Sequence, residues 1–436
     1  GDSAEELCQQ LASVVPIIMS NLTQSFAAVS LLLCSMTSHA APAIKPKLIL
    51  QITVDQLRGD LPTRYYNRLG KGGFRYLWES GIVYRNAHHA HANTETIVGH
   101  ATLATGAHPS VHGMIGNLWF DRETGFTTYN VEDPEYRLLT AGAAVDARAE
   151  IDPTQRAARS EGRSPTAMLV TTFADELRSS TNGKAKAVGI SVKDRGAISM
   201  AGHSGTAYWF SKAGGAFVTS NYYLDRYPDW VTQWNAKKLV QRYANQQWQL
   251  LHAQDSYLFG GSDDRAWETD VAGFGRVFPH AYGPGTSRYY TKLLTLSPAG
   301  DELVRDFAKA SLLAGQLGED AIPDYLSISF SSTRYVGHVF GPSSLEAEDN
   351  ILRLDRTLEN LLTCVDEHVG LANTLIVLSS DHGGPDAPGY LNKLGIPAGY
   401  IDPGSWDGEA AILRIKKKFN IEGPLIETYE HPYLYF

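Results

Sequence analysis

The stretch Asn93–Asn117, NTETIVGHATLATGAHPSVHGMIGN, is the one around which the rest of the chain is organised. It opens with hydroxyl and acidic side chains and continues with apolar residues at roughly helical spacing as far as Gly106, where a helix would stop. Thr94 and Thr96 therefore lie at or just before a helix N-terminus, where unpaired backbone N–H groups favour an anion. A threonine in this place is either a helix cap or a nucleophile, and the cap is the commoner role.

The composition is that of an ordinary globular protein. The chain has 436 residues, of which 43% are hydrophobic and 19% charged, so it is long enough for one large domain with insertions or for two domains. The net charge of −9 argues against nucleic acid as a general partner, because nothing supplies a basic face. The one dense cationic run, LRIKKKF at 413–419, is typical of a solvated helix face.

The N-terminal segment Met19–Ala40 resembles a secretory signal peptide. Phe26–Cys34 is a short apolar core, and Ser38–Ala40 is a cleavage site of the small-x-small type. Residues 1–40 would then be an upstream extension followed by the signal peptide, although an N-terminal helix that packs on the domain is the alternative. No stretch reaches the ~20 apolar residues that span a bilayer. We therefore expect an exported protein, periplasmic or secreted, without a stable membrane anchor.

Apolar, β-rich runs alternate with helical patterns along the remaining chain, which predicts an α/β domain with a mostly parallel sheet. The segment 118–322 has a looser pattern, and we expect it to combine core elements with a cap-like insertion. The predicted strands are 47–54, 82–87, 185–192, 324–330 and 374–378, and the most regular predicted helices are 72–80 and 345–369.

Metal-capable side chains follow three of the predicted strands, where open α/β sheets place their ligands. They are Asp55, the pair Asp381 and His382, and His338. Aspartate and histidine together with a hydroxyl suit Zn²⁺, and a cation beside Thr96 would lower the pKa of its hydroxyl. Singly, these residues could be a helix cap, a turn and a core histidine. Their coincidence at one edge of the sheet predicts a metal-activated threonine nucleophile.

Two further sets of residues suit a phosphoryl group. Lys193 and Arg195 are two positions apart, and on an extended segment they would point the same way and converge on one anion. Two cations match a phosphate monoester better than a diester, which carries less charge. Asn117 could donate its amide to a phosphoryl oxygen. The alternatives are a solvated surface pair for Lys193 and Arg195, and a turn for Asn117.

The segment TIVGHATLATGAHPSVHGMIGN resembles the nucleophile segment of the alkaline phosphatase superfamily, in particular of PafA-like phosphate monoesterases and the related nucleotide pyrophosphatases/phosphodiesterases. The resemblance runs from about Lys47 to Phe436 and includes VDQLRGD, SVKDRGAI and SSDHGG. It implies a three-layer α/β/α fold, two zinc ions per chain and a phospho-threonine intermediate. The residues that it implies are the nucleophile Thr96, the phosphoryl-binding residues Asn117, Lys193 and Arg195, and the metal ligands Asp55, Thr96, Asp381 and His382.

Two departures from the family concern its second zinc ion, which is held by an Asp-x-x-x-His motif and a further histidine near the C-terminus. In SSTRYVGHVFGP, His338 is present, but Arg334 stands at the aspartate position. The chain also ends at Phe436, before the last histidine would occur. We therefore expect one complete metal site in a C-terminally incomplete catalytic domain, 41–436. Arg334 would repel a second cation, or could bind phosphate itself.

These observations leave three functions open. The first is zinc-dependent hydrolysis of small-molecule phosphate monoesters through a phospho-threonine, which Lys193 and Arg195 favour. The second is a phosphodiesterase or nucleotide pyrophosphatase on the same scaffold. The third is an inactive phosphate-binding fragment, which Arg334 and the missing histidine favour.

Overall fold

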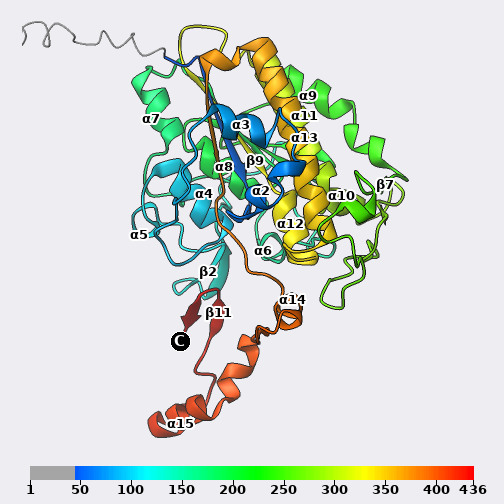
Figure 1. Ribbon diagram of the computed structural model, residues 1–436. Helices are drawn as coiled ribbons and strands as arrows, with labels where there is room; N and C mark the ends of the chain where they lie inside the picture. The colour runs from blue at the N-terminus through cyan, green and yellow to red at the C-terminus, as the bar shows by residue number, and fades with distance from the viewer. Residues whose placement is uncertain (1–44) are drawn as a thin grey trace, which may run out of the picture. The chain divides into compact units, whose positions relative to one another are not determined.

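The structure, a computed structural model, describes residues 45–436 (Figure 1). The extension and the signal peptide predicted within residues 1–40 lie outside the described residues. In the part from 45 to 436, none of the helices combines the length and the apolar character that a bilayer crossing needs.

The centre of the fold is a six-stranded sheet in which β10, β1, β9, β4 and β5 are parallel and β6 is antiparallel to β5. Thr53 near the end of β1 lies opposite Ser379 of β10 on one side and Ser329 of β9 on the other, so these three strands end level with one another. In sheet order, the strands are β10 (Thr374–Ser379), β1 (Leu48–Val54), β9 (Asp324–Phe330), β4 (Ala187–Ser191), β5 (Thr206–Ser211) and β6 (Ala216–Val218).

Helices cover both faces of the sheet, which makes the domain a three-layer α/β/α structure, as predicted (Figure 1). Successive residues of β5 belong to different apolar clusters: Trp209 packs in the cluster of one face and Phe210 in that of the other. Both faces are therefore buried at the inner strands, which explains why these strands are near-continuous apolar runs, while the edge strand β10 leaves Leu375 and Val377 partly exposed. The helices are α4 (Thr96–Thr105), α7 (Phe173–Ser180) and α8 (Asp194–Ala201) on one side, and α11 (Pro298–Ala314), α12 (Ser332–Val339) and α13 (Leu345–His368) on the other.

The predicted strands 47–54, 185–192, 324–330 and 374–378 and the predicted helices 72–80 and 345–369 are all present, with small changes at their ends. The predicted strand at 82–87 is wrong. Ile82 and Tyr84 are 82% and 79% exposed, and no strand of the described residues pairs with this segment. High β-propensity does not make a strand where no neighbouring strand accepts and donates the backbone hydrogen bonds.

The segment 118–322 supplies β4, β5, β6, α7, α8 and α11 to the core, and its other elements are short. They lie in the loops between the core elements. The short elements of this segment are β2 (Leu118–Asp121), β3 (Phe126–Tyr129), α6 (Pro153–Arg156), α9 (Asp229–Ala236), β7 (Gln247–Trp248), β8 (His280–Ala281) and α10 (Tyr290–Thr295), and those near the N-terminus are α2 (Leu61–Arg64), α3 (Phe74–Ser80) and α5 (Pro109–His112).

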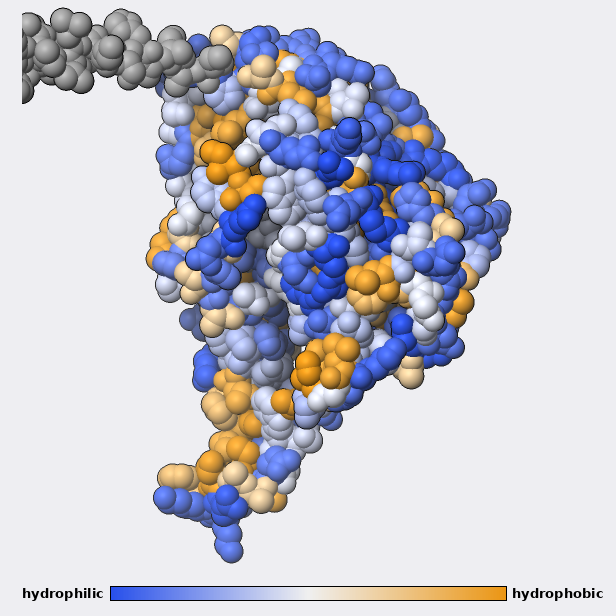
Figure 2. All heavy atoms as spheres, in the orientation of Figure 1, coloured by the Kyte–Doolittle hydropathy of each residue, from blue (hydrophilic) through white to orange (hydrophobic). Residues whose placement is uncertain are grey.

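The last part of the chain forms an arm that extends from the sheet domain and returns to it through contacts between β11 and β2 (Figure 1). Its helix α15 (Ala410–Phe419) has no buried residue, so the cationic run 413–419 lies on a solvated helix, as predicted. Figure 2 shows apolar surface along this arm, where Leu413 and Phe419 are exposed. The other elements of the arm are α14 (Pro388–Lys393), β11 (Thr428–Glu430) and β12 (Tyr433–Tyr435).

Candidate active site

The carboxyl ends of β1 and β10 bring three of the predicted metal ligands together. Asp55 directly follows β1, and Asp381 and His382 follow β10, its parallel neighbour. The ligand atoms of these three buried residues lie within 4.8 Å of one another. Backbone N–H groups orient Asp381, whose Oδ1 accepts hydrogen bonds from the amides of Gln56 at 3.0 Å and His382 at 2.9 Å. The local sequence thus places two carboxylates and an imidazole at one point of the sheet edge.

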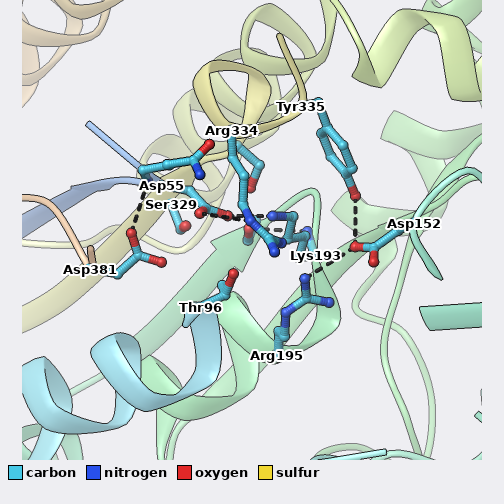
Figure 3. Close-up of polar contacts among 12 residues, drawn as sticks. Asp55, Thr96, Asp152, Lys193, Arg195, Ser329, Arg334, Tyr335 and Asp381 are labelled. Atoms are coloured by element: carbon cyan, nitrogen blue, oxygen red, sulfur yellow. Dashed lines mark hydrogen bonds and ion pairs between the residues drawn. The ribbon is translucent and has the colours of Figure 1, made fainter. Parts of the chain in front are cut away.

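Thr96 is the first residue of α4, and Gly106 ends the helix with φ of 66°, as predicted. The Thr96 side chain is fully buried, and its Oγ1 has no hydrogen-bond partner among the described residues. The residue at the N-cap position is Glu95, and no side-chain capping bond is made at this helix end. The capping role that we considered for Thr96 is therefore not used, and the hydroxyl faces the space that Asp55, Lys193 and Arg334 border (Figure 3).

Asn117 lies beside the same helix end. Its side-chain Oδ1 accepts a hydrogen bond from the backbone N–H of Ile97 at 3.1 Å, while its Nδ2 is buried without a partner in the described part of the chain. Buried polar groups are nearly always paired, so an unpaired amide next to the unpaired Thr96 hydroxyl calls for a ligand. At a helix N-terminus that ligand is an anion.

Lys193 and Arg195 point into the same space from the start of α8 (Figure 3). The predicted extended geometry is wrong, because only Lys193, the N-cap residue, is extended, while Arg195 lies in the first helical turn. Lys193 Nζ contacts Asp55 Oδ2, and Arg195 Nη2 donates to Asp152 Oδ2 at 3.1 Å. Both side chains are 0% exposed, which excludes the alternative of a solvated surface pair.

The charges of these groups shift one another's pKa values. Burial would raise the pKa of Asp55, but Lys193, His382 and Arg334 together hold it well below its usual value. Burial and the charge of Arg334 lower the pKa of Lys193 to about 7. Asp152 is also buried, and Arg195 and Lys193 hold its pKa well below the usual range. Asp55 and Asp152 are therefore ionised at neutral pH, as a metal ligand and an ion-pair partner must be.

The structure separates His338 from the metal-capable cluster. His338 is exposed and lines a cleft of about 160 Å³ together with Gln56, Arg58 and Trp267. Arg334, one helical turn earlier on α12, is the residue that reaches the cluster: its Nε lies 3.8 Å from Asp55 Oδ1. The predicted motif therefore contributes its cation, and not its histidine, to the site.

Three residues that sequence reasoning missed hold the site in place. His100 Nδ1 lies 3.0 Å from Asp381 Oδ2, and its Nε2 lies 2.9 Å from the hydroxyl oxygen of Ser329. A Cβ on Gly99 would meet the backbone oxygen of Asp381 at 2.0 Å, so only glycine allows α4 to approach this loop. Asp152 binds Arg195 from a polar segment without periodicity. For these three residues the one signal in the sequence is the pair Gly99-His100, which lies shortly after Thr96.

The residues present fit a metal ion of the zinc type. Thr96 Oγ1, Asp55 Oδ1 and His382 Nε2 are buried without hydrogen-bond partners among residues 45–436, and Asp381 completes a set of oxygen and nitrogen donors. Carboxylates, an imidazole and an oxygen at the fourth position make up a common donor set for Zn²⁺. We therefore regard Asp55, Thr96, Asp381 and His382 as one candidate metal site.

Comparisons with known proteins identify the family of the chain. A family model described as "Type I phosphodiesterase / nucleotide pyrophosphatase" matches residues 49–422. The alkaline phosphatase PhoV of Synechococcus elongatus is 37% identical over 354 residues, which are 80% of this chain and 61% of PhoV. The alkaline phosphatase PafA of Elizabethkingia meningoseptica is 35% identical over 377 residues, 86% of this chain and 66% of PafA. The chain thus spans about two thirds of the length of these relatives.

The fold gives the same result. The crystal structure of wild-type alkaline phosphatase PafA superimposes with a TM-score of 0.80 at 32% sequence identity, covering 91% of this chain and 73% of that chain. The family match, the fold and the parallel-sheet position of the site are mutually consistent. The chain belongs to the type I phosphodiesterase / nucleotide pyrophosphatase family, among the PafA-like members of the alkaline phosphatase superfamily.

Proposed function

We propose that this chain hydrolyses phosphate monoesters through a covalent intermediate on Thr96, with Zn²⁺ held by Asp55, Thr96, Asp381 and His382. The observation that carries the proposal is the Thr96 hydroxyl, which is buried at a helix N-terminus and has no hydrogen-bond partner in the described part of the chain. Support also comes from the relatives PhoV and PafA, which are named alkaline phosphatases. A solved PafA variant carries substitutions at a threonine, an asparagine, a lysine and an arginine, the residue types of our candidate set.

The reaction has two displacements at phosphorus. Thr96 Oγ forms a bond to phosphorus as the bond to the leaving oxygen breaks. The proton of the Thr96 hydroxyl passes to water, and the leaving oxygen takes a proton from water. Water then attacks the phospho-threonine, which releases inorganic phosphate and restores the hydroxyl. A bound zinc ion would favour the ionised form of the Thr96 hydroxyl and so supply the nucleophile at neutral pH.

The other residues of the site hold the phosphoryl group. Asn117 Nδ2, the one polar atom of that side chain without a partner, donates to a phosphoryl oxygen. Arg195 is held by Asp152 and Tyr129, with Nη1 donating to the Tyr129 hydroxyl at 3.1 Å, so its guanidinium is oriented before substrate arrives. Lys193 adds a second charge. Two cations compensate a dianionic monoester better than a diester.

The test is hydrolysis of an aryl phosphate by the zinc-loaded protein. We expect Thr96→Ala to lower the rate at least about a thousandfold, because the nucleophile is removed. Thr94→Ala is the matched control. It is the same substitution, at an exposed threonine two positions before Thr96. A Thr96→Ala protein as active as the Thr94→Ala protein would overturn the mechanism.

The second candidate function is phosphodiester or pyrophosphate hydrolysis, which the description of the matching family model favours. Rates on a monoester and a diester with the same aryl leaving group separate the two functions. A preference for the diester would replace our proposal. We also infer that the protein is exported, and this rests on the signal-peptide pattern of Met19–Ala40.

A further inference from the structure

Arg334 is a buried cation that the mechanism above does not use. Its side chain is 12% exposed, and its Nε has no hydrogen-bond partner among the described residues. Figure 3 shows the side chain extending from α12 into the space bordered by Thr96, Lys193 and Arg195. An arginine normally satisfies several of its five N–H donors when buried, so an unpaired Nε here indicates a missing anionic partner.

The residues around Arg334 do not fit the second zinc ion that the family implies. The aspartate of the motif is replaced by a guanidinium, and His338 is not within the metal-capable cluster of the described residues. Arg195 and Arg334 bring two permanent positive charges to this space, and Lys193 adds a third when it is protonated. A second divalent cation would meet repulsion from these groups, and the carboxylates Asp55 and Asp152 are already paired with them.

We propose that this centre takes one metal ion and that Arg334 contacts the phosphoryl group in place of a second. A guanidinium presents planar, paired N–H donors that match two phosphoryl oxygens, and it keeps its charge at every pH of interest. Asp55, 3.8 Å from Arg334 Nε, steadies the side chain without saturating its donors. The inference rests on the proposed phosphatase function, because it assigns a substrate contact within the same site.

The experiment measures metal content and phosphate binding, without turnover. Zinc-loaded protein is analysed by metal mass spectrometry and titrated with inorganic phosphate in a calorimeter. We expect one zinc per chain in the parent and in Arg334→Gln, with phosphate bound about 10- to 100-fold more weakly by the variant, since one charge-assisted contact is lost. Arg288→Gln is the matched control. Arg288 is 49% exposed and pairs with Asp146, so neither quantity should change.

Two zinc ions in the parent, or equal phosphate affinity for Arg334→Gln and Arg288→Gln, would overturn the inference. Arg334→Lys keeps the charge but not the paired N–H donors. It replaces Arg334→Gln in the binding measurement if the glutamine variant does not fold. We expect it to retain one zinc and to bind phosphate several-fold more weakly than the parent, and unchanged binding would also contradict us. The proposed function is tested separately, by comparing the turnover of Thr96→Ala with that of Thr94→Ala.

Discussion

Two buried groups of carboxylates in this molecule differ in what surrounds them. In the active site, Asp55 and Asp152 face Lys193 and Arg195 across ion pairs within hydrogen-bonding distance. Burial alone would raise the pKa of both carboxyls, yet the neighbouring cations hold both pKa values well below the usual range. These acids are therefore ionised in the folded protein.

The second group, which we call the carboxyl cluster, consists of Asp263, Glu268 and Glu346. Burial and the nearby Asp263 raise the pKa of Glu346 well above its usual value, and burial and Glu346 raise that of Glu268 to about 8. Within the described residues, the ion-pair partner of Glu346 is His280, at 3.2 Å, and burial lowers the pKa of that histidine. No ammonium or guanidinium in the described part of the chain forms an ion pair with the cluster.

The difference shows that neighbouring cations, and not burial, keep a carboxyl group ionised and therefore able to bind a metal ion. Both groups lie inside the protein, but only the active site keeps its acids ionised and its cations close. Protonated acids are poor metal ligands. The comparison therefore explains why Asp55, and not Glu346, is a candidate ligand.

The largest expected effect that could break this comparison comes from Asp55→Asn. Lys193 and Arg334 would keep their buried charges without a carboxylate, so we expect the free energy of unfolding of the zinc-free protein to fall by about 3–5 kcal/mol. Zinc binding should be lost as well. Denaturant unfolding and metal analysis measure the two effects.

The control for that experiment is Asp55→Asn combined with Lys193→Met, which removes both partners of the pair. Replacing both partners should recover the part of the unfolding free energy that the unpaired Lys193 loses, while Arg334 stays without its carboxylate and zinc binding stays absent. If Asp55→Asn alone were as stable as the parent and still bound zinc, the ion pair would not have the role that the comparison gives it.

A smaller effect is expected from Gly99→Ala, which tests how the active-site carboxylates are held in place. Alanine normally stabilises a helix relative to glycine, by roughly 0.5–1 kcal/mol. Here the new Cβ would lie 2.0 Å from the backbone oxygen of Asp381, so we expect a loss of about 1–3 kcal/mol and weaker zinc binding. Thermal unfolding and zinc titration measure these changes. Gly261→Ala, where a Cβ meets nothing within 4 Å, should leave both unchanged.

The smallest expected effect is on how the free energy of unfolding depends on pH, and it tests most directly how the carboxyl cluster differs from the active site. Because folding raises the pKa of Glu346, its contribution to stability is present below the unfolded pKa and is lost as pH rises through the folded value. The parent should therefore lose stability relative to Glu346→Gln as the pH rises from 5 to 9. Unfolding free energies at the two pH values provide the measurement.

Asp152→Asn should show the opposite trend. Its folded pKa is lowered, so the carboxylate stabilises the protein above the unfolded pKa, and that contribution is lost as pH falls through the folded value. The variant should be less stable than the parent at neutral pH, with a deficit that shrinks toward acid. Parallel pH trends in the two variants would contradict the contrast between the two clusters.

Much of the site could be predicted from sequence because its residues follow elements with strong local patterns. Asp55 and Asp381 come after apolar runs that are recognisable as parallel strands, and level strand ends place them together. The place of Thr96 at a helix N-terminus could be predicted from the apolar spacing of the helix that ends at Gly106. In each case the pattern lies within a few residues of the functional side chain.

The remaining features depend on contacts between distant segments, which local patterns do not record. Asp152 meets Arg195 across 43 residues of sequence, and His100 meets Ser329 across 229. The expected strand at 82–87 failed for the same reason, since a strand requires a partner from elsewhere in the chain. The extended geometry predicted for Lys193 and Arg195 was wrong at Arg195, because a helix begins at Asp194.

The order of the strands has one more consequence. Strand β10 is one of the two edge strands of the sheet, and among the described residues it pairs with β1 alone. An ion held jointly by the residues that follow β1 and β10 would link these two strands at their carboxyl ends. Metal binding would then stabilise this edge of the sheet, and loss of the metal would make local opening along Thr374–Ser379 easier.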